Sequence, residues 1–176
     1  MTILDYHRLK ASELEALDLA RLEAEVRAES AAFPETVESL LPPPEEKHLR
    51  REGWPHYERF RSLCELYLGA NAAQRQFIRS RINWTRAYQL GLFRSQAREL
   101  AMETKSEHLL RLALVSLVID YFNVGDSRDA ILSLQRLLVA ARHIGIDWSA
   151  LVLSVADTAG DGMAALYRDF LKNHPA

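Results

Sequence analysis

The sequence is poor in cysteine, since Cys64 is the only one among 176 residues. A single cysteine cannot form a disulfide within the chain or a zinc site built from several thiolates, and it is typical of proteins in a reducing compartment. We therefore expect the stability to come from a hydrophobic core and the location to be cytoplasmic.

Long hydrophobic runs are also absent. The longest apolar stretch extends from Leu112 to Ile119, and Arg111 and Asp120 flank it. A membrane-spanning helix needs about 20 apolar residues, so this stretch is predicted to be a buried core helix. Near the amino end, Asp5 and Arg8 interrupt the apolar run that a signal peptide would need. We expect no membrane partner.

Neither sign of charge dominates, and catalytic motifs are missing. The formal net charge is −2, so no global charge drives the chain onto nucleic acid or an acidic membrane. The seven glycines lie at turns or singly within predicted helices, so no glycine loop is present to hold a phosphate. Nucleophile-elbow and zinc-protease patterns are absent as well. The sequence predicts no catalytic residues, no cofactor and no metal site.

What the sequence does contain is a succession of helix signals. Apolar residues make up 48% and charged residues 26%, which is ordinary for a globular protein. No segment alternates apolar and polar residues cleanly, as an exposed strand would. Short turns, such as 123–126 and 160–162, separate the periodic segments and force antiparallel neighbours. We predict an all-α single domain, an antiparallel helical bundle or short helical stack of about seven or eight helices.

Composition divides this domain into three regions. We predict an acidic N-terminal helix within residues 1–32, a proline-rich connector over 33–55, and a helical core over 56–176. The N-terminal helix should begin at a capping box formed by Ser12 and Glu15 and end near Ala31. In the connector, a short helix over 34–41 should be followed by the stiff segment 42–44, because three successive prolines favour an extended conformation.

Two segments should form the centre of the core. Residues 107–122 are apolar almost all round, which is typical of a helix buried on every side. Residues 128–144 carry a rich apolar stripe. Ser106 should cap the first of these helices, and Gly145 should end the second in the left-handed conformation.

Three apolar residues outside this core are candidates for binding a partner. Leu19 and Leu22 lie nearly opposite the main apolar stripe of the N-terminal helix, so that helix has two apolar sides. Trp54 follows the prolines of the connector, which could present it to another protein.

The segment from Leu66 to Arg98 contains no acidic residue. Arginines recur through it, with aromatic residues between them. Because arginines bind phosphates and aromatic rings stack on bases, five of them are candidates for a nucleic-acid face on one helix, either unbroken or interrupted near Asn83. These are Arg75, Arg79, Arg86, Arg94 and Arg98.

The alternative is that these arginines pair within the fold or face water. Residues 1–53 hold 7 basic and 12 acidic residues, a net of −5, and residues 54–104 hold 8 and 4, a net of +4. The opposite charges could complement each other, and blocks of charge are more often structural than functional.

The remaining polar residues favour structural roles. The pair Glu45 and His48 has metal-ligand spacing, but a di-iron bundle needs two such pairs and two further glutamates. Cys64 has apolar helical neighbours and should be a core residue. Asp120 ends a buried helix, so we expect it to pair with Arg128, Arg111 or a helix N-terminus. An enzyme site around His56, Glu58 and Cys64 remains an alternative.

The stretch from Leu109 to Ile146 resembles one helical hairpin of the HEAT type. It has leucines along its first helix, Asp120 near the end of that helix, and Ser127-Arg128-Asp129-Ala130-Ile131 at the start of the second. The resemblance implies an antiparallel helix stack. The composition, rich in leucine, alanine and arginine, also resembles that of many bacterial proteins.

Taken together, these patterns favour a non-enzymatic helical protein-interaction domain, adaptor-like or scaffold-like. Its expected partner is another protein or a second copy of the chain. The alternatives are a nucleic-acid-binding protein that uses the arginines of residues 75–98 and an enzyme with a helical active site.

Overall fold

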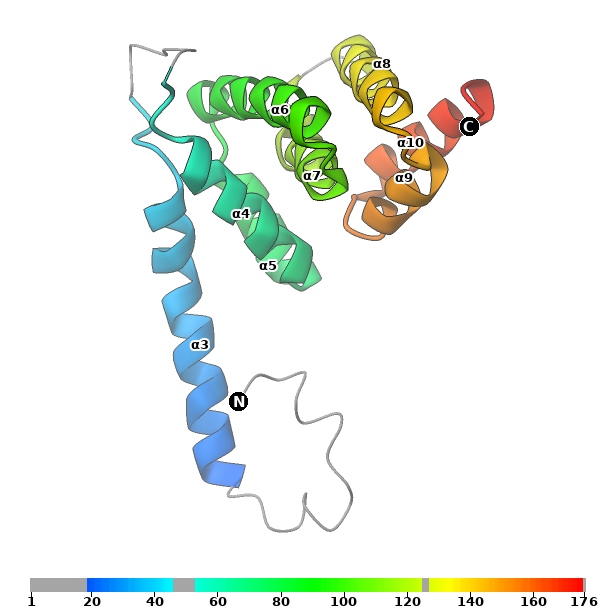
Figure 1. The fold of residues 1–176 in the computed structure, drawn as a ribbon. Coiled ribbons are helices and arrows are strands. Elements are labelled where there is room, and N and C mark those ends of the chain that lie inside the picture. Colours follow the sequence, from blue (N-terminus) through cyan, green and yellow to red (C-terminus); the bar gives the residue numbers. More distant parts are fainter. Residues whose placement is uncertain (1–18, 46–52, 125–126, 176) are drawn as a thin grey trace. The chain divides into compact units, whose positions relative to one another are not determined.

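The computed structural model describes residues 19–45, 53–124 and 127–175, and Figure 1 shows its fold. These residues form eight helices and no strand, which confirms the predicted all-α class. The helices are α3 (Leu19–Leu40), α4 (Tyr57–Gly69), α5 (Ala72–Ser80), α6 (Trp84–Thr104), α7 (Glu107–Val124), α8 (Ser127–Ile144), α9 (Trp148–Ala156) and α10 (Asp161–Asn173).

The chain divides into two compact units, Met1–Glu38 and Ser39–Ala176. Most of α3 belongs to the first unit, and α4 to α10 all belong to the second. None of the helices in the described residues is long and apolar enough to cross a membrane.

Helix α3 differs from the sequence prediction. We predicted a helix that ends near Ala31 and a second one over 34–41, but α3 continues through Pro34 to Leu40. A proline inside a helix removes one hydrogen bond and usually costs about 3 kcal/mol. Here Ser30 and Pro34 are both exposed, so water can reach the carbonyl that loses its donor. The proline-rich segment is therefore helical over its first residues.

Helix α7 forms the centre of the second unit. It packs most extensively on α6 and also contacts α8, α4, α9 and α5. Its apolar side chains are buried from Leu110 to Ile119. This confirms that the segment over 107–122 is a core helix enclosed by its neighbours.

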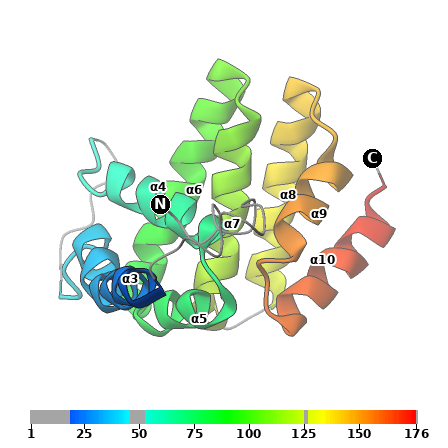
Figure 2. The same ribbon diagram turned by 90° about the horizontal axis from the view of Figure 1, so that it is seen from below.

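Consecutive long helices in this unit run antiparallel, so α6 and α8 run parallel to each other. Figure 2 shows α6, α7 and α8 side by side, with α7 between the other two. Helices α6 and α8 also contact each other. Helices α6 and α8 are therefore parallel neighbours, and both pack on α7.

Local capping fixes where these helices begin and end. Asn83 accepts a hydrogen bond from the Arg86 backbone and starts α6, so the segment over 72–104 is two helices. Ser106 Oγ accepts from the backbone N–H of Leu109 at 3.2 Å, as predicted. Gly145 follows α8 with φ of 75°, which confirms the predicted left-handed helix end.

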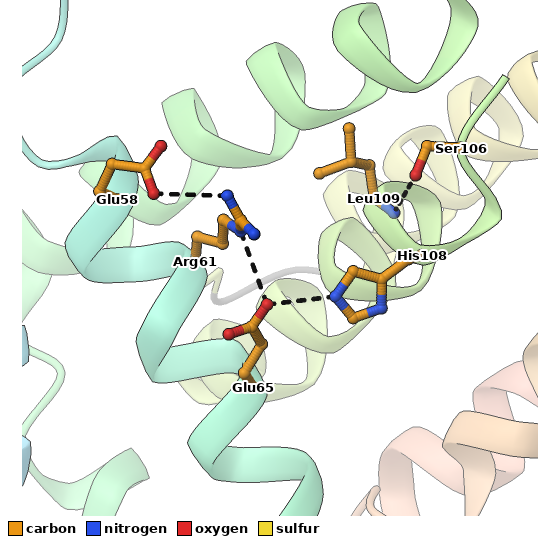
Figure 3. Close-up of polar contacts among 6 residues, drawn as sticks. All are labelled: Glu58, Arg61, Glu65, Ser106, His108 and Leu109. Atoms are coloured by element: carbon orange, nitrogen blue, oxygen red, sulfur yellow. Dashed lines mark hydrogen bonds and ion pairs between the residues drawn. The ribbon is translucent and has the colours of Figure 1, made fainter. Parts of the chain in front are cut away.

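An exposed polar cluster joins α4 to the start of α7 (Figure 3). Glu65 Oε1 lies 3.2 Å from His108 Nε2 and 3.5 Å from Arg61 Nε. Arg61 also reaches Glu58 at 3.5 Å on the same helix. Because these groups are largely exposed to water, we assign the cluster little stabilising free energy.

Candidate functional site

Large apolar side chains are exposed at five positions in the described part of the chain, each at least half accessible. They are Trp84 and Tyr88 on α6, Leu132 and Val139 on α8, and Leu153 on α9. Single exposed apolar residues are ordinary on protein surfaces, but a gathering of them marks a contact surface. Four of these five lie on the two parallel helices.

The face of α6 that exposes Trp84 and Tyr88 continues along the helix through residues that are half-buried. Its residues are spaced by four, three, four, three and four positions, which places them along one side of a helix. They are Trp84, Tyr88, Gly91, Ser95, Arg98 and Met102. On α8, Leu132, Arg136 and Val139 follow the same spacing.

Two adjoining hollows lie between these helices. The first has a volume of about 180 Å³, and its lining includes Gly91, Arg94 and Ser133. The second, of about 390 Å³, is lined mainly by apolar residues such as Met102 and Val139. Both hollows share Arg98 and Arg136, so together they form one groove, called here the α6–α8 groove.

The charge of this groove is positive. Arg94, Arg98 and Arg136 are among the residues that line it, and none of the lining residues described is acidic. The Arg94 guanidinium is already used: it donates to Asp120 at 2.6 Å and to Ser116 at 3.0 Å. Arg98 lies 3.9 Å from Glu99, and Arg136 is exposed. Arg98 and Arg136 are therefore the cations that the groove presents.

The ion pair between Arg94 and Asp120 fixes α6 on α7 beneath the groove. Burial raises the pKa of Asp120 to about 6, while the adjacent Arg94 acts to lower it. Asp120 is therefore ionised at neutral pH. Our expectation that Asp120 pairs with Arg128 or Arg111 was wrong, because α6 brings Arg94 to it instead.

A groove that is apolar in one half, around Met102 and Val139, and that presents two cations suits one kind of ligand. An amphipathic helix can place its apolar side chains between parallel helices, and carboxylates along its edge can pair with arginines. Bidentate pairing of arginine with a carboxylate also fixes the orientation of the bound segment.

Three of the predicted nucleic-acid arginines are used inside the fold. Arg75 donates to the carbonyls of Tyr67 and Leu68 at the end of α4. Arg79 donates to the Tyr67 hydroxyl at 2.9 Å and to the Thr158 carbonyl at 3.0 Å.

The third of these arginines, Arg86, is buried. It donates to the carbonyls of Pro42 and Arg81, both at 2.9 Å. Because α5 ends at Ser80, the structure does not bring Arg75, Arg79 and Arg86 onto one helical face. Only Arg94 and Arg98 of the predicted set lie in the α6–α8 groove.

Another hollow, of about 530 Å³, lies beside Arg75 and Arg79. Both guanidinium groups there hold helix ends together, since Arg75 also donates to the Asp157 carbonyl at 3.3 Å. Asp157 further reduces the positive charge of this hollow. We therefore regard it as a junction between helices α4, α5 and α9.

Trp54 does not project from the connector as we expected. Its side chain is buried and stacks on Phe60, with 5.5 Å between the ring centroids. The tryptophan therefore anchors the segment before α4 to the core. Leu19 and Leu22 belong to α3, but their side chains lie outside the described part of the structure.

The three residues of the alternative enzyme site are not brought together. Cys64 is fully buried, and burial raises the pKa of its thiol. Glu58 is exposed and pairs with Arg61. Among the described residues no group of three His, Cys, Asp or Glu side chains could hold a metal ion, and His48 lies outside them.

Sequence reasoning missed the contribution of α8 to the groove. Leu132 and Val139 were the signal, since both fall outside the apolar stripe that buries Leu134, Leu137 and Ala141. A second apolar stripe on a helix with a well-defined core face indicates a second contact.

Comparison with known proteins adds no relative: no family model matches the chain, and no curated protein or solved structure matches it either.

Proposed function

We propose that this chain is a non-enzymatic helical protein-interaction domain that binds a helical segment in the α6–α8 groove. One observation carries the proposal. Four of the five large apolar side chains that are exposed in the described residues lie on α6 and α8, and two of them, Leu132 and Val139, line the groove together with the cations of Arg98 and Arg136.

The residue types of this surface support the proposal. Tryptophan, tyrosine and arginine dominate the binding energy of protein interfaces, and α6 carries all three on one face. Burying apolar surface contributes roughly 25 cal/mol per Å², so a helix that covers Leu132 and Val139 gains free energy from both. The arginines would then select partners whose contacting helix is acidic.

Photo-crosslinking in cells that express the chain tests this proposal. A photoreactive phenylalanine replaces Val139 in the groove, and a matched control replaces Leu153, which is similarly exposed but lies on α9. We expect a discrete protein adduct from position 139 and none of that size from position 153. The double substitution R98E/R136E should abolish the adduct, because it reverses the charge that selects the partner.

Two results would contradict the proposal. Equal adduct patterns from positions 139 and 153 would mean that the groove is no more occupied than any other surface. An adduct at position 139 that persists unchanged in R98E/R136E would mean that the groove arginines do not recognise the partner.

A further inference from the structure

We infer that the smaller hollow of the α6–α8 groove, called here the polar hollow, binds a phosphate monoester carried by the helical segment that the groove holds. The inference rests on the proposed function, because it names the chemistry of the same partner. Its first support is charge. The guanidinium groups of Arg94, Arg98 and Arg136 gather at this hollow from two helices, and its described lining contains no acidic residue. Like charges repel, so an anion bound there is favoured.

The guanidinium groups keep hydrogen-bond donors for a ligand. Arg94 bonds its two partners on α7 through Nε and Nη2, so neither bond uses Nη1. Arg98 lies 3.9 Å from Glu99, which is too far for a hydrogen bond. Among the described residues, no carboxylate pairs with Arg136. A phosphate monoester carries a charge of about −1.5 to −2 at neutral pH, which the two outer arginines can balance.

The number of donors favours a phosphate over a carboxylate. Besides the three guanidinium groups, Ser133 lines the polar hollow from α8. One arginine in bidentate contact already uses both oxygens of a carboxylate. A phosphate monoester has three terminal oxygens and can accept from two arginines and a hydroxyl together. Clusters of arginines are also a recurring means of recognising phosphorylated side chains.

Gly91 leaves space for such a group. It lies in the interior of α6, where glycine weakens a helix relative to alanine. Packing does not require it, because a Cβ at this position would meet no neighbouring atom of the described residues within 4 Å. The polar hollow that Gly91 lines measures about 180 Å³. Pockets that enclose drug-sized ligands measure roughly 300–1,000 Å³, so this one suits a phosphoryl group at the end of a side chain.

The adjoining apolar hollow indicates what carries the phosphate. Met102, Leu132 and Val139 line it, and it shares Arg98 and Arg136 with the polar hollow. A small phosphate compound would leave this apolar surface exposed, whereas a phosphorylated peptide places apolar side chains on it. A nucleic-acid strand carries a charge at every nucleotide, but the described lining of the apolar hollow offers no further cation. A phosphorylated protein segment is therefore the ligand that fits both hollows.

Titration of the full chain with phenyl phosphate tests the polar hollow, with benzoate as the matched carboxylate. Binding is followed through the arginine Nε–H resonances of ¹⁵N-labelled protein at neutral pH. We expect phenyl phosphate to bind at least about tenfold more tightly than benzoate, and R136Q to weaken that binding at least about tenfold. R142Q removes an exposed arginine of α8 that does not line the groove, so it should bind as wild type does.

A second variant fills the space and keeps the charge. G91L places a side chain in the polar hollow and should weaken phenyl phosphate binding at least about tenfold, because the ligand and the leucine would occupy the same volume. G91A adds only a Cβ and controls for the change in helix propensity. Circular dichroism of both variants shows whether their helices are retained.

Phosphatase treatment tests the source of the phosphate. The purified chain with photoreactive phenylalanine in place of Val139 is crosslinked in cell extract, before and after the extract is treated with a broad phosphatase that is then inhibited. We expect the adduct at position 139 to disappear after the treatment. Mass spectrometry of the untreated adduct should find phosphoserine or phosphothreonine in the crosslinked segment.

Three outcomes would overturn the inference. Equal affinity for phenyl phosphate and benzoate would do so, and so would unchanged phenyl phosphate binding in both R136Q and G91L, which would place the phosphate elsewhere. An adduct that persists after phosphatase treatment would also overturn it, but would leave the proposed function standing with a partner whose acidity comes from carboxylates. Absence of any adduct at position 139 would remove both, and phenyl phosphate binding without an adduct would indicate a small phosphate compound as the ligand.

Discussion

Asp120 illustrates how one buried side chain couples two helices. Its carboxylate is almost inaccessible to water and is held by Arg94 from the neighbouring helix. Removing one member of such a pair leaves a buried charge without compensation, which is why pairs of this kind are sensitive to substitution. The pair also positions Arg94 at the floor of the α6–α8 groove.

The pKa of Asp120 gives a pH-dependent contribution with a definite sign. Burial raises it from 3.8 to about 6, so between these values the folded chain holds a proton that the unfolded chain releases. The free energy of unfolding therefore gains from this group as the pH falls through that window, by about 3 kcal/mol in total. We expect the stability difference between wild type and D120N to widen by this order from pH 6 to pH 4, measured by urea unfolding.

The control is D129N, which alters an exposed carboxylate on α8. Its stability difference from wild type should change much less over the same pH range. A constant difference for D120N across the window would show that the carboxylate of Asp120 does not titrate as its burial implies.

At this scale the sequence predicted burial better than partners. The apolar neighbours of Cys64 along its helix indicated a core residue, and the side chain is fully buried. The partner of Asp120 could not be predicted, because it depends on the register of α6 against α7. Local sequence carries no information on which turn of one helix faces which turn of another.

Helix ends were predictable where a single residue determines them. Ser106 caps the start of α7 through its hydroxyl, and Gly145 ends α8 with a positive φ, both as predicted. These helix ends could be predicted because capping depends only on residues adjacent in the sequence. The course of α3 through Pro34 was not predicted. The cost of a proline within a helix depends on whether water reaches the exposed carbonyl, which only the fold decides.

The start of α10 allows a matched test of a close approach. A Cβ on Gly160 would lie 2.9 Å from Arg79 Nη1, and that arginine is already held by Thr158. On Gly162 the nearest atom would be Tyr121 at 3.8 Å, an ordinary contact. We expect G160A to lower the free energy of unfolding by about 1–2 kcal/mol, and G162A to raise it by up to about 1 kcal/mol through helix propensity.

Urea denaturation of the two variants measures both effects. If G160A were as stable as G162A, the close approach of Arg79 to Gly160 would not contribute to the free energy of unfolding. The comparison is well matched because both glycines lie at the same helix end.

At the scale of the whole molecule, the all-α class followed from periodicity and turn spacing, but the groove did not. It forms only because α6 and α8, which both pack on α7 and also contact each other, run parallel (Figure 2). The spacing of Leu132 and Val139 in the sequence indicates an exposed apolar stripe on α8. The sequence does not indicate that this stripe lies beside Arg98, because Arg98 belongs to α6 and the packing of α6 against α8 is set by the fold. The HEAT-type resemblance of residues 109–146 stays a prediction.

The arrangement of the arginines explains why a basic segment need not be a nucleic-acid face. Arg75, Arg79 and Arg86 donate mainly to carbonyls at helix ends and turns, where the partial negative charge of the backbone gathers. The cations left for a partner are those beside apolar surface, Arg98 and Arg136. This pairing of charge with apolar side chains favours an acidic amphipathic helix as the ligand.

The most direct measurement of groove occupancy is the alkylation rate of a cysteine placed in it. Val139 and Leu153 are 64% and 59% accessible, so V139C and L153C are matched probes. The native Cys64 should not react, because its thiol is buried and its pKa is raised. For each probe, the alkylation rate inside cells that express the chain is compared with the alkylation rate in dilute purified protein. The rate of L153C corrects for the different concentration of the alkylating reagent in the two conditions.

We expect V139C to react several-fold more slowly in cells, relative to L153C, than in the dilute protein, because an α-helical segment covers the groove. The R98E/R136E background should remove this protection. Equal relative rates in cells and in dilute protein would contradict the account, since the groove would then stand open under the conditions in which the chain works.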